Sequence, residues 1–481
     1  MKHNHSSCNA DMTFQECELA ILRSAVDKAG VRQAKKVVNS PEVQRMIRIV
    51  EAFLRKKQLI CYGGTAINAL LPRQDQFYSK ETDLADYDFF SKNPVEDAKE
   101  LAEIFSNEGF DEVEAKSGQH HGTYKVFVNF IGMADITYLQ KDIFNTLKKE
   151  AKRIGGILYC PPNYLRMSMY LELSRPAGDV SRWEKVLKRL SLLNKHHPLK
   201  ASECKSAEFQ RALSKDKYTE EESAKVYKIV KDTLIGEDVV FFGGFAMSTY
   251  LEYMNKSVKN ILKKRTPDFD VFSEEAELVA TIVKERLIDE GFDKVKVVKK
   301  PCVGEVISAH YQVILGENDT VAFIYEPMAC HSYNKIKINK MEVRIATIDT
   351  MMSLYLAFLY SNRSYYDLTR LLCMSKFLFE VQEKNRLEQK GVLKRFSINC
   401  YGHQETIEEM RSEKTQMFEK LKNERTSSDY EEWFMKYRPG DSKSSIKKDK
   451  KNKTKKSTKK KTKKATKKTK KATKKKTIKR R

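Results

Sequence analysis

The feature that most constrains the fold of this 481-residue chain is a series of landmarks that occurs twice in the same order. A short apolar run ends in Gly-Gly; an Asp-aromatic-Asp motif starts 23 residues later in one copy and 25 in the other, and a Met-Ser-x-Tyr-Leu motif follows. Recurrence in the same order at similar intervals indicates internal duplication of an α/β unit of roughly 130 residues. The matched segments are residues 59–66 and 239–246, 85–91 and 267–273, and 167–171 and 352–356.

Within the first copy, helical and strand-like patterns alternate. Ser40-Pro41 is a typical helix start, a capping residue followed by proline at the first helical position, and apolar residues then recur at helical spacing. A buried strand over 59–62 is broken by Gly-Gly, and a new helix is expected from Thr65 to Leu71. Further strands are expected over 87–90, 125–130 and 133–139.

These patterns predict an α/β (α+β) protein with two tandem units, each a small mixed sheet packed with helices. Helical spacing continues past Arg370 to Tyr437, which predicts C-terminal helices. The expected boundaries are an N-terminal arm or helix over 1–40, a first unit over 41–200, a second over 201–395, C-terminal helices over 396–440 and a tail over 441–481.

The net charge of +25 comes mostly from the tail. Residues 441–481 contain 23 Lys or Arg and two Asp, which leaves 67 basic and 63 acidic residues in the rest of the chain. A Lys/Thr/Ala/Ser segment has almost no apolar surface to bury, so we expect it to be disordered. Such a tail would bind polyanions without sequence preference, as an RNA tether or a targeting signal.

Three aspartates form the strongest candidate for a catalytic centre. Asp86 and Asp88 are two residues apart in an expected strand, so their side chains project from one face. Adjacent carboxylates repel each other unless a cation lies between them, and magnesium binds a few carboxylates together with substrate phosphates. Asp135 places a third charge in an apolar strand, where burial is costly unless the charge is paired or ligates metal. Three such groups can hold two metal ions.

Gly63, Gly64 and Thr65 provide the second part of the candidate site. Two glycines between a strand and a helix let backbone amides approach a triphosphate without interference from Cβ atoms. The start of the helix presents free N–H groups and the positive end of its dipole. The Thr65 hydroxyl is expected to contact a phosphate oxygen. Each motif alone is common in structural turns and surface strands, and it is their order and spacing that favour a site.

Gly-Gly-Thr, Asp86-Tyr87-Asp88 and a later lone strand aspartate together resemble the polymerase-beta-like nucleotidyltransferase superfamily. More narrowly, the chain resembles the catalytic subunit of poly(A) polymerases of large nucleocytoplasmic DNA viruses of the pox-, asfar- and mimivirus type. This narrower resemblance rests on residues 62–68, 86–91, 163–167 and 182–186, and the likeness extends over most of residues 40–375.

The resemblance implies template-independent addition of AMP from ATP to RNA 3′ ends, with two Mg²⁺ or Mn²⁺ ions as cofactors. Asp86 and Asp88 would hold both metals, Asp135 the catalytic one, and Gly63 and Gly64 with Thr65 the triphosphate. Arg182 and Lys185 are candidates for phosphate contacts, but a solvated helix face explains them equally well. The implied partners are ATP and an RNA 3′ end, with a second copy of the chain or a processivity partner as a further candidate. The implied location is the virion and the host cytoplasm.

Two other functions stay open on the sequence alone. The same triad serves synthases of oligonucleotide messengers and other terminal transferases, which differ only in their product. A non-catalytic RNA-binding scaffold would require decay of the site in both units.

The second unit is expected to be inert. It keeps Asp268 and Asp270, but alignment of the third strand puts Phe323 where Asp135 stands. Glu326 lies three residues further, an odd offset that would turn it to the other face of a strand. Phe245 replaces the hydroxyl of Thr65. An equally acceptable interpretation is that the two retained aspartates are surface acids, and either way the unit could bind RNA or form an interface.

The nine cysteines are scattered singly, a pattern that favours reduced thiols over a disulfide framework. His3, His5, Cys8 and Cys17 match no zinc-ligand spacing, and a loose N-terminal arm is the preferred interpretation. No apolar run reaches membrane-spanning length and no secretory signal is evident, so neither a membrane nor a secreted protein is expected.

Overall fold

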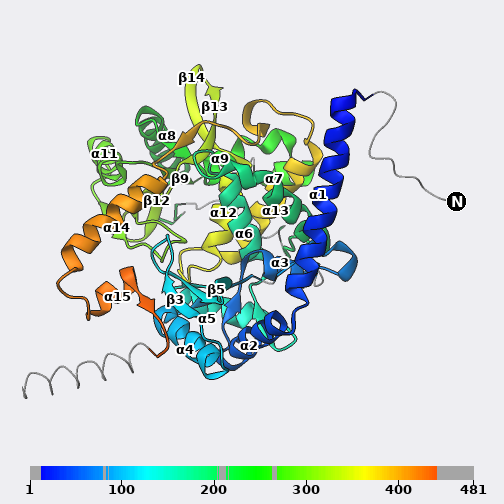
Figure 1. Cartoon of the computed structure of the whole chain (residues 1–481). Coiled ribbons are helices and arrows are strands. Elements are labelled where there is room, and N and C mark those ends of the chain that lie inside the picture. Colours follow the sequence, from blue (N-terminus) through cyan, green and yellow to red (C-terminus); the bar gives the residue numbers. More distant parts are fainter. Residues whose placement is uncertain are drawn as a thin grey trace, which may run out of the picture.

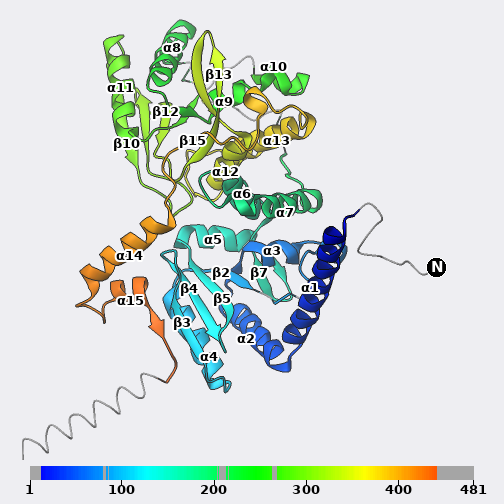
Figure 2. The same cartoon turned by 45° about the horizontal axis from the view of Figure 1, so that its top comes forward.

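Two eight-stranded mixed sheets, each with helices packed against it, form the body of the computed structural model. The structure describes residues 12–79, 83–84, 86–202, 204, 213–214, 216–262 and 268–440. The tail over 441–481, together with His3, His5 and Cys8, lies outside the described residues. The two sheets belong to separate units that lie one above the other in Figure 2, which confirms the predicted tandem α/β architecture.

The strand order is the same in the two sheets, as expected for a duplication. From one edge to the other, the first sheet contains β16 (Lys436–Tyr437), β3 (Val113–Ser117), β4 (Thr123–Val128), β5 (Ile131–Tyr138), β2 (Tyr87–Ser91), β1 (Ile60–Cys61), β7 (Ile157–Tyr159) and β6 (Lys152–Ile154). The second contains β10 (Val295–Lys300), β11 (His310–Leu315), β12 (Asp319–Tyr325), β9 (Phe269–Phe272), β8 (Val240–Phe241), β14 (Met341–Ala346), β13 (His331–Ile338) and β15 (Cys400–Tyr401).

Omitting β16 and β15, every strand of one sheet therefore has a counterpart at the same place in the other. The pairing directions agree as well: β1 and β8 are each antiparallel to one neighbour, β2 or β9, and parallel to the other, β7 or β14. The central strands are buried on both faces, and their apolar side chains form one continuous core with the covering helices. Burial of this apolar surface is the main stabilising contribution.

The helices follow the same repeat except for α5 and α10, which have no counterpart in the other unit. The first unit has α2 (Pro41–Lys57), α3 (Gly63–Leu70), α4 (Pro94–Asn107), α5 (Lys141–Glu150), α6 (Pro162–Leu173) and α7 (Trp183–His196). The second has α8 (Glu220–Gly236), α9 (Gly244–Ser248), α10 (Lys256–Leu262), α11 (Ala276–Asp289), α12 (Ile348–Phe358) and α13 (Leu368–Lys384). Short 3₁₀ turns occur at Arg73–Asp75, Val180–Arg182, Leu251–Tyr253 and Gly391–Leu393.

The two units meet through equivalent helices. α6 and α12, which carry the two Met-Ser-x-Tyr-Leu motifs, pack against each other. The ring of Tyr164 on α6 contacts Tyr360, just after α12, at a centroid distance of 5.2 Å. At the same boundary the Ser332 amide donates a hydrogen bond of 2.8 Å to the carbonyl oxygen of Ser174. Equivalent helices of the two units therefore form the centre of the boundary between them.

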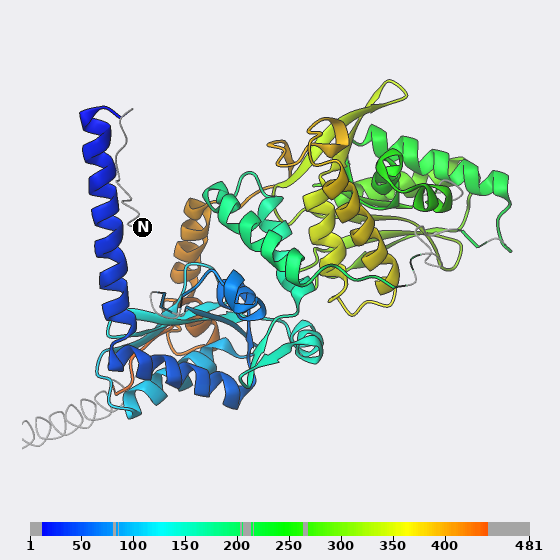
Figure 3. The same ribbon diagram turned by 90° about the vertical axis from the view of Figure 1, so that its right-hand side faces the viewer.

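The two ends of the described chain depart from the repeat. α1 (Phe14–Val38) projects away from the first unit (Figure 3). After the second unit, α14 (Ile407–Leu421) and α15 (Ser428–Phe434) return to the first, where β16 pairs with β3. The predicted C-terminal helices are present, but the expectation of continuous helix from Arg370 to Tyr437 was wrong over 385–406, where a 3₁₀ turn and β15 replace it.

The cysteine prediction also needs correction. Cys204 is bonded to Cys373 and Cys330 to Cys400, with Cα–Cα distances of 5.5 and 5.1 Å. The partners are 169 and 70 residues apart in sequence, so the spacing of neighbouring cysteines gave no sign of them. Among the described residues, no helix combines the length and apolar character needed to cross a bilayer.

Candidate active site

The three candidate carboxylates lie near the amino end of β2 and in the middle of the neighbouring β5. Asp88 on β2 and Asp135 on β5 are directly opposite each other in a parallel pair. Asp86 immediately precedes β2 and lies two residues from Asp88, so the alternation of the strand puts both on the same face. The structure therefore brings together the three residues that the sequence singled out.

Burial and the charges of neighbouring carboxylates raise the pKa of Asp86 and of Asp88. Burial is the largest effect on Asp88, and the charges of Asp86 and Asp135 add to it, so that its pKa rises to about 7. The pKa of Asp86 is also raised, first by burial and then by Asp135. Such a cluster lacks positive charge, and a cation between the carboxylates would relieve the repulsion.

A lysine supplies part of that charge. Lys125 on β4 is the cross-strand neighbour of Asp135, and its ammonium group donates a hydrogen bond to the Asp135 carboxylate. With Asp135 turned to this lysine, no three carboxylate, histidine or cysteine groups of the described part of the chain converge on one metal position. The donors suit a hard divalent ion, and its binding by all three requires Asp135 to exchange Lys125 for the metal.

The Gly-Gly turn lies directly against the carboxylates. Gly63 has φ of +68°, in the left-handed region that favours glycine, and an added Cβ would lie 2.6 Å from Oδ2 of Asp88. An added Cβ on Gly64 would lie 2.6 Å from the Tyr78 hydroxyl and 3.0 Å from Nη1 of Arg189. The two glycines thus allow the turn to pack closely against Asp88 on one side and against Tyr78 and Arg189 on the other.

Thr65 makes a different contact from the expected one. Its hydroxyl donates a hydrogen bond of 2.6 Å to the backbone carbonyl oxygen of Asp86. This bond ties the start of α3 to the residue that begins the carboxylate cluster. A contact between Thr65 and a phosphate stays a prediction, because a bond donated to phosphate requires the hydroxyl proton to turn away from Asp86.

Basic residues on α7 and on the 3₁₀ turn before it lie near the site. Arg182 lies close enough to Asp88 to lower the pKa of that carboxyl, and it pairs with Glu172 at 3.1 Å. Lys185 is exposed to solvent. Arg189, which sequence reasoning missed, donates a hydrogen bond of 2.7 Å to the Tyr78 hydroxyl and borders Gly64. Arg189 lies seven residues after Arg182, so both are on the same face of the helix, and this spacing could have identified Arg189 from the sequence.

In the second unit the equivalent aspartates are buried, so the interpretation of them as surface acids was wrong. Asp268 and Asp270 are only 4% and 8% exposed. Asp268 forms an ion pair of 2.6 Å with Arg370 and accepts a hydrogen bond of 3.1 Å from the Gly244 amide. An added Cβ on Gly243 would lie 2.2 Å from Oδ2 of Asp270. The carboxylates occupy the space over the second Gly-Gly turn.

The pairing of β12 with β9 shows which residue of the second unit takes the place of Asp135. Phe323 on β12 is directly opposite Asp270, as Asp135 is opposite Asp88, which agrees with the sequence alignment of the two copies. Phe323 is fully buried, and its ring contacts Tyr365 at a centroid distance of 5.4 Å. Phe245 packs between Phe241 and Phe269. Aromatic side chains therefore take the places of Asp135 and Thr65 in the second unit.

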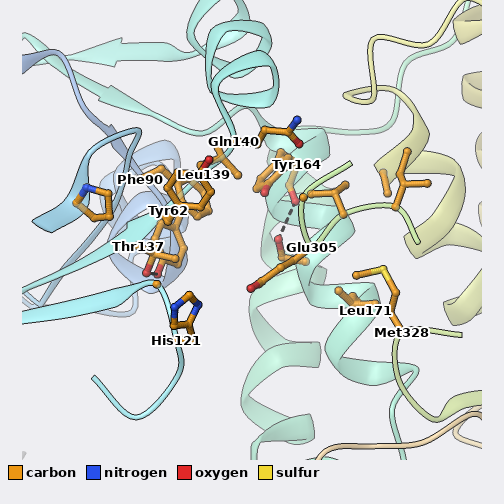
Figure 4. A pocket seen from close by; sticks show the side chains of 18 of the residues that line it. Tyr62, Phe90, His121, Thr137, Leu139, Gln140, Tyr164, Leu171, Glu305 and Met328 are labelled. Atoms are coloured by element: carbon orange, nitrogen blue, oxygen red, sulfur yellow. Dashed lines mark hydrogen bonds between the residues drawn. The ribbon is translucent and has the colours of Figure 1, made fainter. Parts of the chain in front are cut away.

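A cavity of about 790 Å³ lies between the two units, and its lining includes Phe90 and Thr137, which lie two residues after Asp88 and Asp135. Figure 4 shows Tyr62, Phe90 and Thr137 of the first unit on one side of it, and Glu305 and Met328 of the second on the other. The Tyr62 hydroxyl bonds to Thr137 at 2.8 Å, and its ring stacks on Phe90 at a centroid distance of 4.0 Å.

Comparison with protein families gives a match in the first unit. Residues 48–179 match the family model of the poly(A) polymerase catalytic subunit. A candidate poly(A) polymerase catalytic subunit of African swine fever virus (strain Badajoz 1971 Vero-adapted) is 34% identical over 187 residues, which cover 38% of this chain and 39% of the relative. One of Acanthamoeba polyphaga mimivirus is 29% identical over 226 residues, 45% of this chain and 37% of the relative. The aligned parts thus span about two fifths of these relatives.

Among solved structures, the fold is similar to the Megavirus polyadenylate synthase. The TM-score is 0.72 and the sequence identity 19%, and the superposition covers 91% of this chain and 88% of the other. The likeness therefore includes both units, whereas the family model matches only residues 48–179.

Proposed function

We propose that this chain is a template-independent poly(A) polymerase, which adds AMP from ATP to the 3′ end of RNA. One observation carries the proposal: Asp86, Asp88 and Asp135 lie together beside a Gly-Gly turn with an arginine at its edge. The family match over residues 48–179 includes all of these positions except Arg189 and gives the chemistry a substrate class.

The proposed cofactors are two Mg²⁺ or Mn²⁺ ions held by the three aspartates, Asp86 and Asp88 for both and Asp135 for one. When bound, such ions lower the pKa of the attacking hydroxyl and neutralise charge on the leaving pyrophosphate. The proposal is supported by the raised pKa of Asp86 and of Asp88, since a cluster of carboxylates that destabilise one another gains most from a cation.

The chain's own residues have complementary parts in this scheme. The backbone amides at Gly63 and Gly64 would bind the triphosphate, with the guanidinium of Arg189 at its edge. Thr65 holds the Asp86 backbone in place. Lys125 would pair with Asp135 until a cation takes its place.

The partners proposed are ATP and an RNA 3′ end. The term catalytic subunit in the relatives' names suggests a further protein partner, and a second copy of this chain is the alternative. Because the relatives are viral, the proposed place of action is the virion and the host cytoplasm.

The decisive experiment offers the full chain each of the four labelled nucleoside triphosphates, with a short RNA and either Mg²⁺ or Mn²⁺. We expect long tails with ATP only. Digestion of the product by a 3′–5′ linkage-specific nuclease separates poly(A) from 2′-linked or cyclic oligonucleotides. Failure to incorporate any nucleotide would contradict the proposal and favour a non-catalytic RNA-binding protein.

A further inference from the structure

A row of three lysines crosses the first sheet beside the carboxylates. The residues paired from strand to strand are Asp88 on β2, Asp135 on β5, Lys125 on β4, Lys116 on β3 and Lys436 on β16. Neighbouring strands lie about 4.8 Å apart, so the row extends about 14 Å from Asp135 to the edge strand. The lysine row therefore leads in one line from the candidate metal site to the outside of the unit.

The lysines project from the open face of the sheet. Their side chains are 40% exposed for Lys125, 44% for Lys116 and 67% for Lys436. The residues that alternate with them on β3, β4 and β5 are buried on the other face, where α4 packs: Ala115, Val126 and Ala134. A ligand that lies across the strands can therefore reach all three ammonium groups.

The outer part of the row carries more positive charge than its acidic neighbour can neutralise. Three cations lie beside the carboxylate of Glu114, at 3.3 Å for Lys116, 3.6 Å for Lys436 and 3.2 Å for Arg438. Arg438 follows Lys436 by two residues, so both project from the same face. One carboxylate leaves an excess of two positive charges. Exposed ion pairs contribute little to stability, so the anchoring of β16 does not account for this excess.

The second unit shows that the fold does not require these lysines. In the described part of that unit, the equivalent row consists of Asp270 on β9, Phe323 on β12, Gln312 on β11 and Val298 on β10. The lysine beside the third acid is thus lost together with that acid. β10 is itself the edge strand, whereas β3 is followed by β16. The lysine row belongs to the unit that has the complete carboxylate triad.

The path of the C-terminal segment brings further positive charge to the end of the row. After β15 has paired with β13 in the second sheet, α14 and α15 lead back to the first, where β16 pairs with β3 (Figure 2). Residues 441–481, with 23 Lys or Arg and two Asp, follow directly after Gly440. The most basic segment of the chain therefore starts at the outer end of the lysine row.

We infer that the open face of β4, β3 and β16 is a binding site for the sugar–phosphate backbone of single-stranded RNA, with Lys116, Lys436 and Arg438 in contact with phosphates upstream of the 3′ end. The inference rests on the proposed function, which puts the 3′ end at the carboxylate triad. Cations that bind phosphates position a strand without reading its bases. Such contacts suit an enzyme that must hold RNA of any sequence while the end grows.

Equilibrium binding in the absence of ATP tests the site independently of catalysis. Fluorescence anisotropy gives the Kd of the full chain for a labelled single-stranded RNA over a range of salt concentrations. We expect Lys116→Met and Lys436→Met each to raise the Kd about fivefold and to reduce the slope of log K against log salt by about 0.7, because each removes one phosphate contact. Glu114→Gln should instead lower the Kd, since it releases the three cations.

A matched control separates a located contact from general electrostatics. Lys296→Met removes an exposed lysine from β10, the strand of the second unit that corresponds to β3, and should leave the Kd and the slope unchanged. Every variant keeps residues 441–481, so their contribution to RNA binding is constant. An equal loss of affinity in Lys296→Met would contradict the assignment to the first sheet.

Neutral methylphosphonate linkages locate the contacts along the RNA. A series of RNAs is made in which a single methylphosphonate replaces one phosphate, moved stepwise from the 3′ end. The loss caused by Lys116→Met should disappear where the neutral linkage replaces the phosphate that this lysine contacts, because the interaction is then already absent. The corresponding linkage for Lys436→Met should lie further from the 3′ end. Additive effects at every linkage, or the reverse order, would overturn the inference.

The two hypotheses fail in different ways. A chain that shows this coupling but incorporates no nucleotide would contradict the proposed activity and leave the binding site standing. A chain that makes poly(A) while Lys116→Met and Lys436→Met bind RNA as the wild type does would contradict the site alone, and would leave an acidic protein surface as the ligand of the lysine row.

Discussion

In the first unit Asp88 faces Asp135 across two parallel strands, whereas in the second Asp270 faces Phe323 at the same register. The strand order is the same in the two places, and so are the glycines and the first two acids, although Gly63 has φ of +68° and Gly243 has φ of −83°. What differs is the source of positive charge. In the first unit a mobile lysine, Lys125, with its side chain 40% exposed, pairs with one carboxylate. In the second, Arg370, with its side chain only 13% exposed, pairs with a fully buried aspartate.

This difference separates a site kept for chemistry from one kept for stability. The first cluster destabilises itself, because carboxylates that are partly buried and close together raise one another's pKa. In the second cluster, Asp268 is neutralised by an internal ion pair with Arg370 and accepts a hydrogen bond from the Gly-Gly turn. Under the proposed function, the same motif would take a metal ion in one copy, whereas it pairs with Arg370 in the other.

The largest effect is expected at the position where the two units differ most. Asp135→Asn keeps the size of the side chain but removes a charged metal ligand, and we expect kcat for AMP addition to fall by at least about a hundredfold. The matched change in the second unit, Phe323→Leu, should leave activity unchanged. Primer-extension rates for the two purified variants decide the matter. Comparable losses in both would show that the second unit takes part in the reaction.

Stability should respond in the opposite sense at the other pair of equivalent residues. Asp268→Asn leaves the guanidinium of Arg370 buried without its counter-ion, which costs about 3–5 kcal/mol of unfolding free energy. Asp86→Asn, at the same place in the first unit, relieves repulsion and should cost nothing, although it abolishes activity. Urea unfolding measures both variants. Adding Arg370→Met to Asp268→Asn should restore part of the loss, and no restoration would argue against the ion pair as the cause.

The sequence was informative where chemistry or backbone geometry demands one residue type. Glycines at a close approach, aspartates at alternating strand positions and a repeated order of motifs are local signals, and they sufficed for the tandem architecture and for the choice of Asp86, Asp88 and Asp135. Arg370 is 102 residues from the aspartate it neutralises, and Lys125 is meaningful only through cross-strand pairing. The cavity, the disulfides and the return of β16 to the first sheet likewise depend on tertiary contacts that no local pattern encodes.

The response to pH and metal should belong to the first unit alone. The folded-state pKa of Asp88, about 7, is higher than the unfolded value of about 3.9. Protonation of this group therefore favours the folded state, and its contribution to the unfolding free energy is lost as the pH rises from about 4 to above 7. At pH 8 we expect Mg²⁺ or Mn²⁺ to raise Tm by binding the ionised cluster.

A matched pair of variants locates that response. Asp88→Asn should show neither the loss of stability on going to high pH nor the rise in Tm with metal. Asp268→Asn should keep both, on top of a lower baseline. Thermal unfolding with and without metal at pH 5.5 and 8 is the measurement, and a metal response that persists in Asp88→Asn would move the cation site elsewhere.

The smallest effect is expected at Thr65, in the first turn of α3, and at its apolar counterpart Phe245 in the second unit. Thr65→Val removes a hydrogen bond to the Asp86 carbonyl oxygen, worth about 1 kcal/mol, and leaves the first carboxylate less well held. We expect kcat to fall by about fivefold with the KM for ATP unchanged, because the hydroxyl acts on Asp86. A rise in KM for ATP at constant kcat would instead assign the hydroxyl to a phosphate. Phe245→Leu, at the equivalent position, should alter neither constant, since its ring packs only among apolar neighbours of the second core.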